Sequence, residues 1–262
     1  AAALLALLAS AAAFQGRFHG PMVQHTRALR MSQEEVTDDE MTFQRNELRL
    51  TFKKLSEAGG LYWQIQSEPA RLRTLMYLRN LVKSPWSMPA VGLSEGSPAI
   101  VGLWKLVFSN EGRYRSLWQP GAEAYLNVLS NNDDGTGELE LIFRFPVKSF
   151  GLKEARCRGT FRFTSLTRFD YDFHSATLRA FNRYWDIPYG GGGSLGMAWY
   201  SALWWVDAYK QEEGEDAEVF YNVYEYLGDP VLQWNASPRE ASPIDERLEA
   251  KGIKSTATAR WK

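Results

Sequence analysis

The 262-residue sequence contains a single cysteine, Cys157, and three histidines. One cysteine excludes an internal disulfide framework and a structural zinc site built from cysteines. No run of about 18 apolar residues occurs, so an ordinary membrane-spanning helix is not expected. The 30 basic and 31 acidic residues nearly cancel, which does not indicate a nucleic-acid-binding protein. With 11 prolines and 21 glycines, the chain is expected to be neither collagen-like nor wholly disordered.

Aromatic residues, in contrast, are abundant: the chain has 10 tryptophans, 12 tyrosines and 14 phenylalanines. The densest group is formed by Trp199, Tyr200, Trp204 and Trp205. Core filling accounts for part of these rings, but one hairpin does not need so many. Flat, rigid rings are suited to line a pocket for an isoprenoid, a tetrapyrrole or an acyl chain, or to lie at a membrane interface.

The first 31 residues have the composition of a targeting sequence. Residues 1–13 (AAALLALLASAAA) are apolar, with small residues suited to signal-peptidase cleavage before Phe14. Residues 14–31 contain three arginines and no acidic residue, as is typical of an organelle transit peptide. The two parts together resemble the bipartite plastid presequence of algae with secondary plastids. We therefore expect a chloroplast protein on the stromal side of the thylakoid or at a plastoglobule.

Residues 32–98 are predicted to form a helical region and a linker. A capping box at residues 37–40 (TDDE) predicts a helix that ends at Gly59 and has an apolar face of Met41, Leu48, Phe52 and Leu55. A second, strongly cationic helix is expected from about Ser67 to Lys83, with an apolar stripe of Leu72, Leu75, Met76 and Val82. The Pro-, Gly- and Ser-rich residues 84–98 form the linker.

The period of apolar residues then changes to 2, which predicts a β domain over residues 99–236. Residues 138–145 (ELELIFRF) place one apolar face against a polar one, and residues 131–135 form the turn to a partner strand at residues 124–129. Further inward-facing rings are Phe161, Phe163, Phe169, Tyr171 and Phe173. Because no helical crossovers separate the strands, the sequence indicates an up-and-down antiparallel barrel.

Three segments near the end of the chain complete the prediction. The glycine run at residues 190–193 is expected to be a flexible connector, since it lacks the features of a phosphate-binding loop. Residues 195–206 fit either a strand or a buried helix, and residues 219–226 fit a strand. Residues 237–262 are expected to be a polar tail with one short helix near residues 244–251.

Residues 102–109 (GLWKLVFS) open the β domain. They resemble the G-x-W motif of the lipocalin superfamily and, more closely, the opening motif of the plastid-lipid-associated (fibrillin) family. A helical segment precedes the motif in that family, and strands similar to residues 155–163 and 168–173 follow it. The resemblance implies a mainly β (α+β) fold: a lipocalin-like antiparallel β-barrel preceded by two N-terminal helices. It also implies non-catalytic binding of a lipid, quinone or carotenoid at thylakoids or plastoglobules.

Within this motif, Gly102 and Trp104 are expected to be structural. A glycine at position 102 lets the backbone turn tightly into the first strand. Trp104 would plug the closed end of the barrel, and its indole N–H would need a hydrogen-bond partner.

The residues suited to catalysis are few. Asp170, Asp172 and His174 share one face of a predicted strand, and we expect a solvated outer face there rather than a metal site. Cys157 lies between Arg156 and Arg158, whose charges could activate a thiol. Neighbouring side chains on a strand point to opposite faces, so an inert, partly buried cysteine is the better interpretation. We therefore predict neither a catalytic nor a metal site.

The resulting hypothesis is a plastid protein that binds a hydrophobic ligand and contacts the thylakoid surface peripherally. Its candidate ligand-binding residues are Phe143, Phe161, Phe163, Trp199, Trp204 and Trp205. Two alternatives stay open. The aromatic side chains could bind a partner instead, which would make the chain a peripheral subunit or assembly factor of a photosystem or antenna complex. The chain could also carry a chromophore in the manner of the lipocalin-like bilin lyases.

Overall fold

The computed structural model describes residues 38–58, 67–83, 100–110, 122–145, 151–201, 203–210, 219–235, 237 and 240–253. The predictions for the presequence (residues 1–31), the Thr37 cap and the linker (residues 84–98) lie outside this described part of the chain. None of the described helices has a stretch that is both long and apolar enough to cross a membrane.

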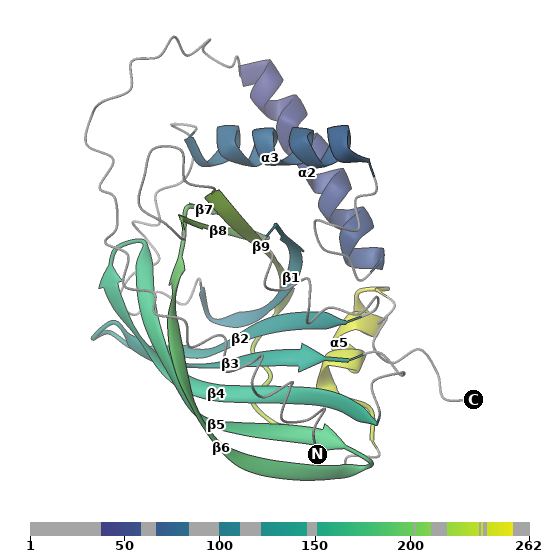
Figure 1. Cartoon of the computed structure of the whole chain (residues 1–262), viewed down its shortest axis with the longest axis vertical. Coiled ribbons are helices and arrows are strands. Elements are labelled where there is room, and N and C mark those ends of the chain that lie inside the picture. Colours follow the sequence, from purple (N-terminus) through teal and green to yellow (C-terminus); the bar gives the residue numbers. More distant parts are fainter. Residues whose placement is uncertain are drawn as a thin grey trace.

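The described residues form one antiparallel sheet of nine strands, in the order β6-β5-β4-β3-β2-β1-β9-β8-β7 (Figure 1). The strands are β1 (Gly102–Ser109), β2 (Glu123–Asn131), β3 (Thr136–Arg144), β4 (Leu152–Ser165), β5 (Arg168–Ala180), β6 (Arg183–Gly196), β7 (Trp199–Tyr200), β8 (Trp204–Lys210) and β9 (Val219–Gly228). Helices α2 (Asp38–Ala58) and α3 (Glu68–Lys83) precede the sheet, and α5 (Pro243–Ala250) follows it. The expectation of a mainly β fold with two N-terminal helices is thus confirmed.

The sheet curls so strongly that strands far apart in its order meet. Phe169 on β5 and Trp205 on β8 are separated by five strands, yet their ring centroids lie 5.9 Å apart. At one corner, the indole N–H of Trp205 donates to the carbonyl oxygen of Gly196 on β6 (2.8 Å). The Gly196 N–H in turn donates to the carboxylate of Asp207 on β8 (2.9 Å).

The prediction of a closed barrel is nevertheless wrong. The described residues contain no ladder between the edge strands β6 and β7, so the sheet is open along this seam. The two-residue β7 is too short to pair along the 14-residue β6. The backbone groups of Gly196 that could extend a ladder are already bonded to the side chains of Trp205 and Asp207.

Helices α2 and α3 pack on the outer face of the sheet, over β1, β8 and β9 (Figure 1). The predicted apolar face of α2 is confirmed, because Met41, Leu48, Phe52 and Leu55 are all buried. The predicted stripe on α3 is wrong at Leu72 and Met76, which are 58% and 50% exposed. The buried residues are Thr74, Leu78 and Leu81 instead. Apolar residues on α3 form two overlapping stripes, and packing against the sheet determines which of the two is buried.

The period-2 pattern correctly predicted the strands that carry the aromatic residues, but it did not identify the glycine run at residues 190–193 as part of a strand. Residues 190–193 are not a flexible connector: they lie within β6, where Gly193 pairs with Tyr171 and Gly191 with Phe173. A Cβ atom on Gly193 would lie 2.6 Å from the Tyr171 hydroxyl oxygen. The glycines therefore leave space for large rings on the neighbouring strand, an arrangement that compensates for their weak strand preference.

The expected short helix near the C-terminus is confirmed as α5, and it lies against the sheet. Ile244 and Leu248 on α5 pack on the outer face with Leu103, Tyr125 and Ile142. Ser242 begins the helix with a capping box in which the Asp245 carboxylate accepts a hydrogen bond from the Ser242 backbone N–H (3.1 Å).

Candidate ligand-binding face

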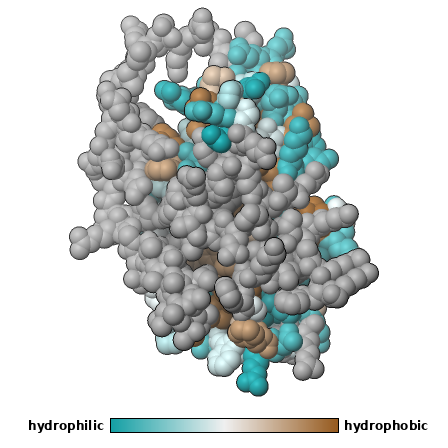
Figure 2. Space-filling view, turned by 45° about the vertical axis from the view of Figure 1, so that its right-hand side comes forward, coloured by the Kyte–Doolittle hydropathy of each residue, from teal (hydrophilic) through white to brown (hydrophobic). Residues whose placement is uncertain are grey.

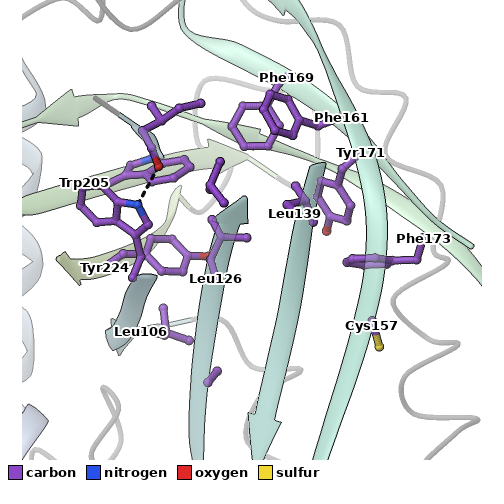
Figure 3. Close-up of a cluster of buried hydrophobic side chains, with 14 of the residues drawn as sticks. Leu106, Leu126, Leu139, Cys157, Phe161, Phe169, Tyr171, Phe173, Trp205 and Tyr224 are labelled. Atoms are coloured by element: carbon purple, nitrogen blue, oxygen red, sulfur yellow. Dashed lines mark hydrogen bonds between the residues drawn. The ribbon is translucent and has the colours of Figure 1, made fainter. Parts of the chain in front are cut away.

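A continuous series of aromatic rings lines the inner face of the curved sheet, meaning the face opposite to α2, α3 and α5. The ring centroids of Tyr226 and Trp104 are 5.0 Å apart, and those of Trp104 and Trp205 are 5.7 Å apart. Trp205 contacts Phe169, whose ring lies 4.8 Å from that of Phe161. Such tilted and edge-on contacts are the arrangements that aromatic pairs prefer. Figure 3 shows Trp205 and Tyr224 on one side of this cluster and Phe161, Phe169 and Tyr171 on the other.

The buried centre of this inner aromatic face is flanked by residues that are partly accessible. Trp104, Phe169 and Trp205 are fully buried. The partly buried residues packed against this centre are Leu141, Phe143, Phe163, Ile187, Tyr189, Leu195, Tyr200 and Tyr226. An apolar molecule placed on this face would therefore contact the flanking residues and leave the centre as a rigid support.

Small residues opposite the rings shape the inner face. Gly137 on β3 pairs with Phe161 on β4, and a Cβ atom on this glycine would lie 2.3 Å from the ring. Cys157 on β4 pairs with Ala176 on β5, so these two neighbouring positions also carry small side chains. The inner face is uneven, because small residues (glycine, alanine and cysteine) alternate with phenylalanine and tyrosine. A face made only of large residues would be flatter.

The polar groups within this aromatic face are hydroxyls and a thiol that stay protonated, and the Asp207 carboxylate beside Trp205 accepts hydrogen bonds from Gly196 and Asn222. Burial raises the pKa of Tyr189 to about 12, with a smaller contribution from Cys157. Burial also raises the pKa values of Tyr200 and Tyr226 above the ordinary value. The pKa of the Cys157 thiol is raised to about 12 by burial. The inner face therefore offers neutral groups, which suit an uncharged ligand.

The six predicted ligand-binding residues fall into two groups. Phe143, Phe161, Phe163 and Trp205 come together on the inner face. Trp199 and Trp204 pack with the helices on the outer face, where the ring of Trp204 lies 5.2 Å from that of Phe52. Trp204 and Trp205 are neighbours on β8, so the alternation of strand side chains sends them to opposite faces.

The two motif residues have the surroundings that their structural interpretation requires. Gly102 has φ +152°, and a Cβ atom there would lie 2.4 Å from the Tyr226 ring. Trp104 is fully buried, and its indole N–H donates to the backbone carbonyl of Ile100 (2.9 Å). Both residues therefore act on the path of β1 and on the packing of the inner face.

The outer face carries a second buried system, made of charges. The Arg144 guanidinium lies 3.4 Å from Glu123, 3.8 Å from Glu154 and 2.6 Å from Asp245 of α5. Lys105 lies 3.8 Å from Glu123, and burial lowers the pKa of this lysine despite the acidic neighbour. The charges of this network pair with one another and join the sheet to α5.

The residues weighed for metal binding or nucleophilic chemistry lie apart. Asp170, Asp172 and His174 are exposed, and Asp170 accepts a hydrogen bond from Ser194. Among the described residues, no group of three or more His, Cys, Asp or Glu side chains could hold a metal ion. Arg156 and Arg158 point to the outer face, where they bind Glu154 and Glu138, so neither activates Cys157.

The tyrosines at the rim of the inner face are missing from the six candidate ligand-binding residues predicted from the sequence. Tyr189 packs on Phe173 (6.1 Å between centroids), and Tyr200 and Tyr226 both pack on Trp104. Their signal was weak because each lies where the alternation is interrupted, at a register shift or on the very short β7. Period-2 patterns identify faces within regular strands only.

No protein-family model matches the sequence, and no curated protein is significantly similar to it. The resemblance of residues 102–109 to the fibrillin motif accordingly stays a prediction based on a short segment.

Proposed function

We propose that this protein binds a hydrophobic, uncharged molecule, such as a lipid, quinone or carotenoid, on its inner aromatic face without changing it chemically. The observation that carries this proposal is the unbroken series of ring contacts from Tyr226 through Trp104, Trp205 and Phe169 to Phe161. Ligand sites are commonly concave, mostly apolar and supplied with a few polar groups that orient the ligand.

The protonated hydroxyls support the choice of ligand class. A phenol such as Tyr189 or Tyr200 can donate a hydrogen bond to a carbonyl or ester oxygen. A phenol is neutral at physiological pH, and burial raises its pKa further. The carboxylate of Asp207 beside Trp205 already accepts hydrogen bonds from Gly196 and Asn222, so an uncharged quinone or acyl lipid fits this face without leaving a charge unpaired.

The first experiment is extraction of the protein, isolated gently from its native source, with organic solvent. Absorbance and lipid mass spectrometry would then identify the extract. We expect one class of pigment, quinone or lipid at about one molecule per chain. An extract without any such molecule, from protein that stays attached to a large complex, would contradict the proposal and favour the subunit hypothesis.

A titration with the uncharged methyl ester of cis-parinaric acid tests the location of the site. Energy transfer from tryptophan to the polyene chain should report binding near Trp104 and Trp205. The double variant Phe143→Ser, Phe163→Ser alters two partly buried rings and should weaken binding about tenfold. The matched control is Leu166→Ser, on an exposed turn between β4 and β5. Equal binding by both variants would place the ligand elsewhere.

The plastid location belongs to the same proposal and rests on the composition of residues 1–31. Fusion of these residues to a fluorescent protein, expressed in an alga with secondary plastids, should direct the reporter to the plastid. Secretion of the reporter, or retention in the cytosol, would contradict it.

A further inference from the structure

The exposed side of helix α3 combines large apolar side chains with basic ones. Leu72 and Met76 are about half exposed, and they lie one helical turn apart, on the same side. Arg73, Arg79 and Lys83 are exposed along the same helix. The helix carries four basic residues and one acidic residue, Glu68, in its first turn. The exposed surface of α3 is therefore cationic and carries two large apolar side chains.

The part of helix α2 that follows its acidic first turn and Glu47 continues this combination. Leu50 is 52% exposed and is flanked by the exposed residues Arg49, Lys53 and Lys54. Both helices pack their buried faces on the same part of the sheet, so both exposed faces look away from it. Figure 2 shows hydrophobic side chains standing among hydrophilic ones over this helical region.

Two of these basic side chains have no ion-pair partner among the residues that the structure describes. Neither Arg73 nor Lys83 forms an ion pair there, in contrast to the paired arginines of the outer face of β3 and β4. Their charges are thus exposed beside the apolar side chains of Leu72 and Met76.

We propose that the exposed sides of α2 and α3 dock on an anionic lipid bilayer surface, with Leu72 and Met76 inserted among the headgroups. Isolated apolar side chains within a basic stripe are typical of helices that lie in a membrane interface. The centre of a protein–protein interface is instead contiguous, and lysine is depleted there. This surface is separate from the inner aromatic face, and the proposal does not depend on ligand binding.

The test is co-sedimentation of the full chain with vesicles of phosphatidylcholine, alone or mixed with phosphatidylglycerol. We expect binding to the mixed vesicles, little binding to the neutral ones, and loss of binding as sodium chloride is added. Each basic residue near an anionic surface strengthens binding about fivefold, so Arg73→Gln with Lys83→Gln should weaken it about thirtyfold. Leu72→Ser with Met76→Ser should weaken it about tenfold.

The matched control replaces Arg162 with Gln and Leu166 with Ser, two exposed residues of the β4–β5 hairpin. It should bind the mixed vesicles like the unmodified protein. Equal binding to both kinds of vesicle, an equal loss in the control, or no binding at all would overturn the proposal. The Arg73→Gln, Lys83→Gln variant should keep its energy transfer to the methyl ester of parinaric acid. A parallel loss of transfer would show that one surface does both tasks.

Discussion

Along the same strands, the inner face of the sheet buries aromatic side chains, whereas the outer face buries charged ones. On the inner face, β1 and β4 contribute Trp104 and Phe161, whereas on the outer face they contribute Lys105 and Glu154. All four residues are buried. Alternation along a strand therefore separates two sets of side chains, but it does not decide which set is covered. On the outer face the covering element is α5, which supplies Asp245 to Arg144.

The largest effect expected from this comparison is at the neighbouring residues Trp205 and Trp204. Trp205→Ala removes a fully buried indole and leaves the carbonyl of Gly196 without its donor, so we expect a loss of about 5 kcal/mol in the free energy of unfolding. Trp204 is partly buried against Phe52, and Trp204→Ala should cost about 2 kcal/mol. Chemical denaturation measures both. Equal losses would mean that the two faces contribute alike at β8.

A second comparison sets the buried arginine of the outer face against an exposed one. Arg144→Met leaves Glu123 and Glu154 buried without their main cation, and we expect a loss of about 4 kcal/mol. Arg158→Met breaks a contact with Glu138 (2.6 Å) that is as short as the one between Arg144 and Asp245, but both side chains are about half exposed. That loss should stay below about 1 kcal/mol. A similar loss in the two variants would show that distance, and not burial, sets the strength of these ion pairs.

The contrast between the inner and outer faces also explains how much of the fold could be predicted from the sequence. The regular alternation in residues 138–145 correctly joined Leu139, Leu141 and Phe143 on one face. It also predicted that the opposite face is polar, but not that Glu140 and Arg144 on that face are buried. No local pattern indicates that a helix 100 residues later covers Arg144, because that contact depends on tertiary packing.

The candidate site was predictable where strands are regular and not where they are interrupted. Phe161 and Phe163 were found from their alternation, but the rule was not applied to Trp204 and Trp205, which lie on one strand and face opposite ways. The open seam could not be foreseen either, since it results from the short β7 and from the side chains that bond to Gly196. A local motif such as residues 102–109 predicts how a strand begins and does not predict how a sheet ends.

Two glycines, one at the start of the interior strand β1 and one in the edge strand β6, give a third, smaller contrast. Gly102→Ala places a methyl group against the Tyr226 ring at a positive φ, and we expect it to cost about 2 kcal/mol. A Cβ atom on Gly190 meets nothing within 4 Å, so Gly190→Ala should be neutral or stabilise the protein by about 0.5 kcal/mol. Thermal unfolding of the two variants measures the difference. A destabilised Gly190→Ala would mean that β6 needs the freedom of its glycines.

The smallest expected effect concerns the inner face at alkaline pH. Burial raises the pKa of Cys157 from 9.0 to about 12, so the folded protein holds the thiol proton more tightly than the unfolded chain does. The stabilisation is complete below pH 9 and is lost progressively as the pH rises from 9 to 12, by about 1 kcal/mol at pH 10. Cys157→Ala removes this contribution, so its free energy of unfolding should fall less than that of the unmodified protein between pH 8 and pH 10. Tyr200 and Tyr226, whose pKa values do not depend on Cys157, titrate alike in both proteins and cancel in the comparison. Tyr189 adds to the difference in the same direction, because Cys157 contributes to its raised pKa. Identical pH profiles would mean that solvent reaches the thiol and that the inner face is more open than its buried rings indicate.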